Sequence, residues 1–276
     1  MGASKFYIMN EKSVRYDLNS PEKGVFTAPD GFGVAYAAEY LAVGNIWVAE
    51  SRTLEQPAPS GKIMFPKNPY QTFNDFINFI NTASSLVLVY KPAGMETEYF
   101  ADIDIVNIKK GGYNCKAFEV PIQFKCKSLF YTSEKFEYHV ERTNKEIRWD
   151  FRWETKFNDQ NSVFFSFHND GHVDAPFVLS FTGYCLKPAI TIVQAGKQIY
   201  KSTYNVELQA NERLEISTFD GDLYIQKNGE DAKSCLDFTQ ENFFKLPTGD
   251  SEIYFTCEAG ILNNIVLNLE KYYKGV

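Results

Sequence analysis

Residues 70–90 read YQTFNDFINFINTASSLVLVY, a stretch in which the hydrophobic period changes once. From Phe73 to Ile80 the apolar side chains recur at i, i+3, i+4 and i+7, with Asn and Asp between them, which is the pattern of a helix with one buried face. From Leu86 to Tyr90 every residue is apolar or aromatic, as in a strand. The stretch therefore predicts one amphipathic helix over about residues 69–83 that leads into a strand.

Two later stretches alternate between apolar and polar residues, which is the period of a strand with one buried face. Phe118–Cys126 places Phe, Val, Ile and Cys on one face and Glu, Gln and Lys on the other. Tyr99–Ile108 alternates in the same way, with Asp102 and Asp104 facing away from the apolar positions. These patterns predict that the helix packs on a sheet.

The residues before the helix are divided by turn sequences. Asn19–Pro21, Pro29–Gly31 and Gly44–Asn45 separate apolar runs such as Val25–Phe26 and Ile46–Val48. We therefore expect short strands joined by loops in this part of the chain.

Composition narrows the class of protein. The chain has 276 residues, which favours two domains, and its 24 Phe and 17 Tyr favour strands over helix bundles. A formal net charge of −7 argues against a nucleic-acid partner. No apolar run reaches the roughly 20 residues that span a bilayer, and the start lacks a signal-like apolar core. We expect no membrane insertion and folding in a cytosol.

A polar stretch, Glu141–Glu146, marks the best domain boundary, which predicts one domain over residues 1–145 and a second over 146–276. Beyond it, Ile147–Trp153 and Val163–Phe167 alternate as strands do. Turn sequences recur at a spacing close to the roughly 8–12 residues of a sandwich. They are Asn169–Gly171, Asp220–Gly221, Asn228–Gly229 and Thr248–Gly249. The second domain is predicted to be an antiparallel β-sandwich.

The five cysteines are odd in number and widely spaced, mostly within strand-like sequence. They are Cys115, Cys126, Cys185, Cys235 and Cys257. Buried free thiols are the interpretation that this pattern favours over disulfides or metal ligation.

The order of these elements resembles the distal tail protein family of long-tailed bacteriophages. In the first half the resemblance is carried by Met64–Pro66, Tyr70–Ile80, Leu86–Tyr90 and Ser128–Tyr131. In the second half it is carried by Asn169–Pro176, Asp220–Gly221, Asn228–Gly229 and Phe243–Asp250. None of these stretches is a catalytic signature.

The resemblance implies a mainly β protein of two β-sandwich or barrel-like domains, the second a galectin-like or carbohydrate-module-like sandwich. It also implies a ring, a hexamer, which joins the tail tube to the tail-tip hub and presents the C-terminal domain outward. The expected partners are copies of the chain and tail-tube and hub proteins, with receptor-binding proteins or host glycans beyond them. The expected location is the virion tail, after folding in the bacterial cytoplasm.

The sequence contains no complete catalytic or cofactor-binding motif. The sequence has no Gly-x-Ser-x-Gly nucleophile turn, and Gly31–Gly33 lacks the third glycine and the helix of a phosphate-binding loop. His168, His172 and Asp174 resemble a metal cluster, but Asn-Asp-Gly between them favours a turn. We therefore predict a non-enzymatic chain with no cofactor and no metal site.

One pair of carboxylates has the spacing of a catalytic pair. Asp102 and Asp104 would stand about 7 Å apart on one strand, within the range of an inverting glycosidase pair. No other feature of the sequence supports that chemistry, so an exposed strand face is the favoured interpretation.

Glycan binding is the alternative function that the sequence leaves open. A sandwich domain binds sugars when aromatic rings form a platform for the apolar face of the sugar. Candidate platform residues are Trp149, Trp153, Tyr138 and Tyr184. The alternation of the two tryptophans with charged residues favours core packing for them.

Overall fold

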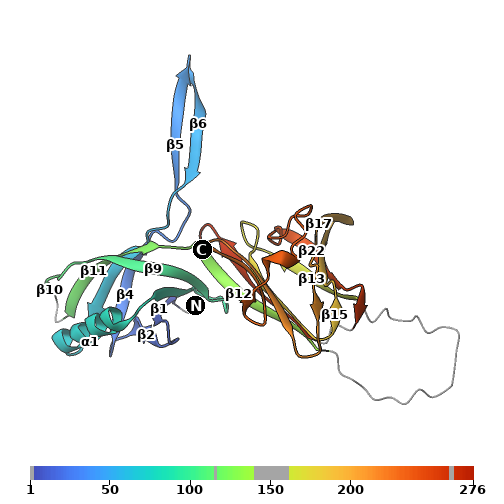
Figure 1. Cartoon of the computed structure of the whole chain (residues 1–276). Helices are drawn as coiled ribbons and strands as arrows, with labels where there is room; N and C mark the ends of the chain where they lie inside the picture. Colours follow the sequence, from blue (N-terminus) through green and yellow to red (C-terminus); the bar gives the residue numbers. More distant parts are fainter. Residues whose placement is uncertain (1–2, 115–116, 140–161, 261–263) are drawn as a thin grey trace. The chain divides into compact units, whose positions relative to one another are not determined.

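The computed structural model describes residues 3–114, 117–139, 162–260 and 264–276. These residues form antiparallel strands and one α-helix, which confirms the predicted mainly β fold (Figure 1). Two compact units are present: Met1–Thr132 with Tyr272–Val276, and Ser133–Lys271. The domain break predicted at residue 145 and the strand predicted over Ile147–Trp153 lie outside the described residues. Within the described ranges, no helix is long and apolar enough to cross a membrane.

The first unit is built on a sheet that closes on itself. Its strands pair in the order β1–β8–β9–β11–β7–β4. Residues 15–20 close the sheet because β2 pairs with β1 while β3 pairs with β4. The strands are β1 (Lys5–Asn10), β2 (Arg15–Asp17), β3 (Asn19–Ser20), β4 (Gly24–Asp30), β7 (Ser60–Phe65), β8 (Leu86–Lys91), β9 (Tyr99–Ile108), β10 (Tyr113–Asn114), β11 (Ala117–Cys126) and the start of β12 (Phe130–His139).

The helix α1 (Pro69–Thr82) lies where the sequence predicts it and covers the core of the first unit. It begins after Asn68, which has a left-handed φ of 45°, and its first residue is a proline, whose fixed φ suits a first turn. Phe76 is fully buried, and its ring centroid lies 6.0 Å from that of Phe65 and 5.1 Å from that of Tyr16. The apolar face predicted from the 3.6-residue period is therefore the face that packs on the sheet.

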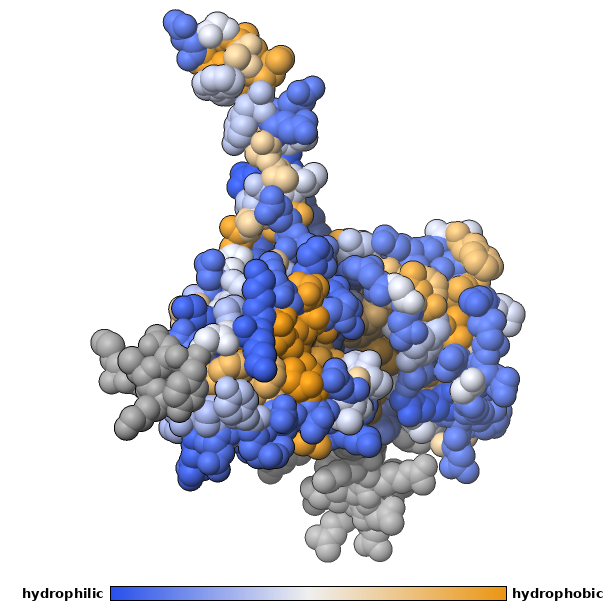
Figure 2. All heavy atoms as spheres, turned by 90° about the vertical axis from the view of Figure 1, so that its left-hand side faces the viewer, coloured by the Kyte–Doolittle hydropathy of each residue, from blue (hydrophilic) through white to orange (hydrophobic). Residues whose placement is uncertain are grey.

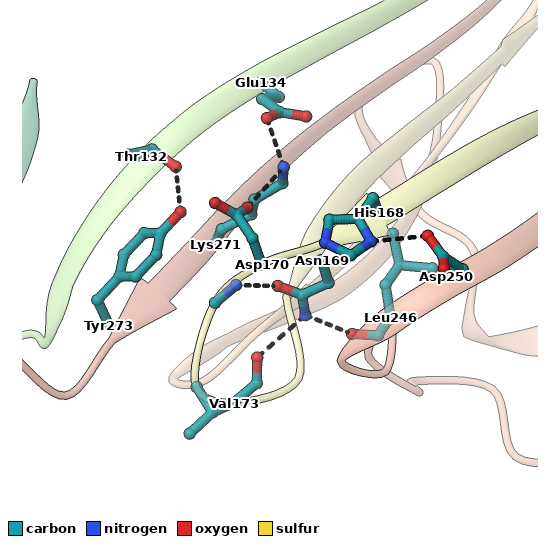
Figure 3. A network of polar contacts seen from close by, with 11 residues as sticks. Thr132, Glu134, His168, Asn169, Asp170, Val173, Leu246, Asp250, Lys271 and Tyr273 are labelled. Atoms are coloured by element: carbon teal, nitrogen blue, oxygen red, sulfur yellow. Dashed lines mark hydrogen bonds and ion pairs between the residues drawn. The ribbon is translucent and has the colours of Figure 1, made fainter. Parts of the chain in front are cut away.

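The last five residues of the chain return to the first unit. Tyr273 is buried there, with its ring centroid 5.0 Å from that of Tyr99. Its hydroxyl lies 3.5 Å from the hydroxyl of Thr132 (Figure 3). The Val276 N–H donates to the Phe32 carbonyl at 3.0 Å. Both ends of the chain are thus part of one unit.

The second unit is an antiparallel sandwich. One sheet has the order β21–β20–β19–β14–β24, and the facing sheet has the order β13–β22–β16–β17. One apolar core lies between them, in which Phe181 and Phe255 have ring centroids 5.9 Å apart. The elements are β13 (Ser162–Asn169), β14 (Phe177–Thr182), β15 (Cys185–Leu186), β16 (Ala189–Gln194), β17 (Lys197–Thr203), β18 (Glu207–Leu208), β19 (Arg213–Phe219), β20 (Asp222–Lys227), β21 (Glu230–Asp231), η1 (Lys233–Cys235), β22 (Gly249–Thr256), β23 (Ala259–Gly260) and β24 (Asn264–Tyr273).

A buried lysine links three elements of the second unit (Figure 3). Lys271 is 7% exposed, and its Nζ lies 2.6 Å from a Glu134 oxygen and 3.0 Å from an Asp170 oxygen. The ammonium also lies 5.3 Å from the centre of the Phe167 ring. Burial lowers the pKa of Lys271, but the hydrogen bonds to Glu134 and Asp170 outweigh burial, so the pKa is raised overall. The pairs fix β12, β24 and the loop after β13 together.

The four cysteines within the described residues are free thiols, as predicted. Cys126, Cys185 and Cys235 are buried and Cys257 is partly buried, while Cys115 lies outside the described residues. Burial raises the pKa of Cys126 and Cys185 to about 12 and that of Cys235 to about 11. These three side chains are therefore neutral thiols at pH 7 and act as small apolar groups.

Replacing Phe76 with alanine is expected to destabilise the first unit by about 3–5 kcal/mol, because it removes a fully buried ring and leaves a cavity. Urea denaturation followed by circular dichroism measures the change. Asn74→Ala, on the exposed face of the same helix, is the control and should change stability by less than about 0.5 kcal/mol. Equal effects of the two substitutions would contradict the anchoring role of Phe76.

Lys271→Met is expected to destabilise the second unit by about 1–3 kcal/mol at pH 7, because two carboxylates lose a shared cation. The pKa of Lys271 is raised above its usual 10.5 in the folded state. Its stabilisation is therefore present at neutral pH and lost as the pH rises through the folded pKa. Guanidinium denaturation at pH 7 and above 10.5 measures this loss.

Lys245→Met is the matched control for Lys271→Met, because Lys245 pairs with the exposed Asp220. It should cost no more than about 1 kcal/mol. A Lys271 effect that equals the control, or that does not shrink at high pH, would show that the buried pairs do not stabilise the unit.

Candidate assembly surface

Two strands of the first unit form a projecting arm. The arm consists of β5 (Tyr36–Val43) and β6 (Ile46–Leu54), which pair with each other and with no other described strand. Figure 1 shows it extending away from the rest of its unit. Every strand residue of the arm is exposed except Ala38, which is partly buried. The arm therefore receives little support from the core.

The turn at the end of the arm has the chemistry that a tight hairpin needs. Gly44 and Asn45 are its two central residues, between the paired Val43 and Ile46. Gly44 has a φ of 64°, the positive value required at the first central position of a type II′ turn, which glycine adopts without strain. Because the turn has only two central residues, β5 and β6 remain paired up to the end of the arm.

The outer half of the arm, residues 40–49, is the tip, and it is apolar on both faces. Residues directly opposite in paired strands share a face, and successive residues alternate between faces. One face carries the pairs Leu41–Val48 and Val43–Ile46. The other carries the pairs Tyr40–Ala49 and Ala42–Trp47. Figure 2 shows apolar side chains gathered at the tip, and Trp47 is 72% exposed.

The lower half of the arm, its shaft, is polar by contrast. Glu39, Glu50 and Arg52 are found there, and the Arg52 guanidinium lies 4.0 Å from the centre of the Tyr36 ring. Such side chains are compatible with water. The polarity of the arm thus changes along its length, from a solvated shaft to an apolar tip.

The tip's two apolar faces restrict what can cover them. A hairpin with one apolar face is covered by lying on a surface, whereas a hairpin with two needs contacts on both sides. Complete burial of a Val, Leu, Ile or comparable side chain contributes about 1.5–3 kcal/mol, and an isolated hairpin is only marginally stable in water. The arrangement therefore favours a tip that is inserted into a partner surface.

The turn of the arm is predicted from the sequence, but the arm itself is not. Gly44–Asn45 was predicted as a turn, and that prediction is confirmed. The signal that would have revealed the arm is a two-residue turn flanked by apolar residues at successive positions, Leu41–Val43 and Ile46–Val48. A strand that is apolar at successive positions has no polar face to expose to solvent.

The two described residues of the predicted sugar platform, Tyr138 and Tyr184, have different surroundings. Trp149 and Trp153 lie outside the described residues. Tyr138, in β12, is partly buried on the core of the second unit, with its ring centroid 6.4 Å from that of Phe165. Tyr184 is 46% exposed between β14 and β15. Among the described residues no ring contact joins these two tyrosines.

The loop that resembles a metal cluster is held by polar contacts within the protein. His168 Nδ1 lies 2.7 Å from an Asp250 carboxylate oxygen. The buried Asn169 side chain donates to the carbonyls of Val173 at 3.1 Å and Leu246 at 3.2 Å (Figure 3). In the part of the chain that the structure describes, no three His, Cys, Asp or Glu residues are gathered as a metal site.

The carboxylates predicted to share a strand face both lie on β9. Asp104 lies 3.3 Å from the Lys127 ammonium. Burial raises the pKa of Asp102. Its backbone N–H donates a hydrogen bond to the Ser128 hydroxyl at 3.0 Å. These contacts are those of a strand packed against its neighbours.

Comparisons with known proteins match this fold. Residues 5–127 match the family model described as the N-terminal domain of the distal tail protein. A chain of the phage P2 baseplate, in its activated conformation with calcium, has a TM-score of 0.63 and 14% identity, with all of both chains covered. The Dit protein of SPP1, described as a paradigm of the hub adsorption apparatus of phages that infect Gram-positive bacteria, has a TM-score of 0.61 and 10% identity, over 96% of this chain and 98% of that one. No curated protein sequence matches the chain.

The fold of the whole chain and the family model over its first unit define a class: this is a β-rich structural component of a phage tail tip. Residues 5–127 carry the N-terminal domain of the distal tail protein family, so the family predicted from the sequence is confirmed over this part of the chain. Members of this family are structural proteins of the phage tail and associate with other tail proteins. The matches favour this role over that of a carbohydrate-binding module.

Proposed function

We propose that the chain forms a closed ring through its first unit, in which each arm tip inserts into the neighbouring copy. The observation that carries this proposal is the tip, which is apolar on both faces and far from any core of its own. The ring joins the tail tube to the tail-tip hub. Its copy number, six, follows from the resemblance to distal tail proteins.

A second copy of the chain is the occupant that best explains the arm. In a rotationally closed ring each subunit uses one surface to bind the next, so every tip is buried in the same way. A charged shaft with Glu39, Glu50 and Arg52 remains hydrated or pairs at the rim of such an interface. A partner present in fewer copies than the ring would leave some tips exposed to water.

The second unit serves as the part that faces outward. Its sandwich core is complete in itself, with both sheets contributing apolar side chains. We propose that it keeps the galectin-like character that the family resemblance implies and is available to receptor-binding proteins or to host glycans.

Ile46→Asp combined with Trp47→Asp is expected to abolish self-association, because two carboxylates are placed on opposite faces of the tip, where burial would cost several kcal/mol. Sedimentation velocity should give a hexamer for the native chain and a monomer for the variant. The free energy of unfolding of the monomer should change by less than about 0.5 kcal/mol, because both residues are exposed.

Leu223→Asp is the control for this experiment, because Leu223 is 53% exposed in the second unit and lies outside the arm. It should leave the assembly intact. A native chain that stays monomeric at high concentration and fails to bind tail-tube or hub proteins would contradict the proposed role. A tip variant that still assembles would contradict the arm as the contact.

A further inference from the structure

The outer face of one sheet of the second unit carries a stacked aromatic pair. Phe164 of β13 and Tyr254 of β22 are directly opposite each other, so their side chains share a face. Their ring centroids are 5.8 Å apart with an interplanar angle of 25°. Phe164 is 62% exposed, while the neighbouring inward-facing residues of these strands form the core. The pair presents an apolar surface on the outer face of the sheet.

A cavity opens beside this pair on the same sheet. Its volume is about 460 Å³, and its wall includes Ser166, His168, Asp250 and Glu252. Ser166 and Glu252 are paired two residues along the strands from the aromatic pair, so ring and cavity are adjacent. The volume is that of a site for a small ligand.

The polar groups of the cavity are hydrogen-bond acceptors on fixed strands. The Glu252 carboxylate accepts a hydrogen bond from the Tyr254 hydroxyl at 2.6 Å, which ties the acid to the aromatic pair. Asp250 is held by His168, with 2.7 Å between the imidazole Nδ1 and a carboxylate oxygen. Carboxylates accept hydrogen bonds from neighbouring hydroxyl groups, which is how a polyol is oriented.

The charge of the cavity restricts the ligand. Two carboxylates and one imidazole line it, which disfavours anionic ligands such as phosphate-bearing or uronic polymers. An aromatic face beside hydroxyl-accepting carboxylates fits a molecule with one apolar ring face and a rim of hydroxyls. A neutral saccharide has both.

We propose that this outer face binds a neutral saccharide, with one sugar ring stacked on Phe164 and its hydroxyls donating to Glu252 and Asp250. The binding site differs from the platform predicted from the sequence, since it uses other residues. It extends the proposed role of the outward unit, and it holds whether or not the first unit forms a ring.

The test is binding of the full-length protein to a printed array of neutral oligosaccharides, with sialylated and phosphorylated glycans on the same array. The native chain should bind neutral saccharides and not the anionic ones. Phe164→Ala should weaken that binding about tenfold or more, and Phe164→Tyr, which keeps a ring, should retain it. Phe238→Ala is the matched control, because Phe238 is 84% exposed in the same unit and lies outside this sheet.

Several outcomes would overturn the proposal. They are absence of binding to every neutral saccharide, preference for anionic glycans, and equal losses in the Phe164→Ala and Phe238→Ala variants. A loss of assembled mass in Phe164→Ala without sugar binding would assign the face to a protein contact instead. Sedimentation of the same samples separates this failure from failure of the ring, which depends on the arm.

Discussion

An apolar arm tip that its own unit leaves exposed is the constraint on which the proposed assembly depends. The first unit does not bury the apolar side chains of the arm tip. The arm extends away from the unit and does not fold back onto it (Figure 1). The arm leaves the closed sheet between β4 and β7, and its root is anchored by Phe32, whose ring stacks on that of Phe130 at 5.8 Å. The hydrogen bond from the last residue, Val276, to the Phe32 carbonyl adds to this anchor. These contacts fix the base of the arm to the core of the first unit.

Local periodicity was sufficient for the elements that pack on a core of their own. The helix near residues 69–83, the strand Tyr99–Ile108 and the alternation of Phe118–Cys126 follow from one face being buried, and each is present with nearly the expected bounds. The arm could not be predicted in the same way, because its outer strand residues are apolar on both faces and pack on no core of their own unit. The packing of Tyr273 in the core of the first unit also could not be predicted, because local periodicity does not indicate which core a buried residue joins.

The two units use their strands differently. In the first, the sheet closes and leaves the arm as its exposed apolar element, whereas in the second the two sheets enclose a core and leave patterned outer faces. Alternation shows which residues share a face but not whether that face is exposed to solvent. The exposure of Phe164 was therefore not predicted from the sequence, since its neighbours in β13 are core residues. The buried Lys271 of β24 pairs by charge with Glu134 of β12 and with Asp170 of the loop after β13. The proposed assembly contact and the proposed ligand-binding face therefore lie in separate units of one chain.

The most direct measurement of the central claim is the solvent access of Trp47. The chain has three tryptophans, so Trp149→Phe with Trp153→Phe leaves Trp47 as the sole indole fluorophore. Acrylamide quenching is then followed as the protein is concentrated through the range in which it associates. Burial of the tip in a neighbouring copy predicts a blue-shifted emission and strong protection in the assembled form, and full exposure in the dilute monomer. Quenching that stays at the monomer's level in the assembled ring would contradict the account.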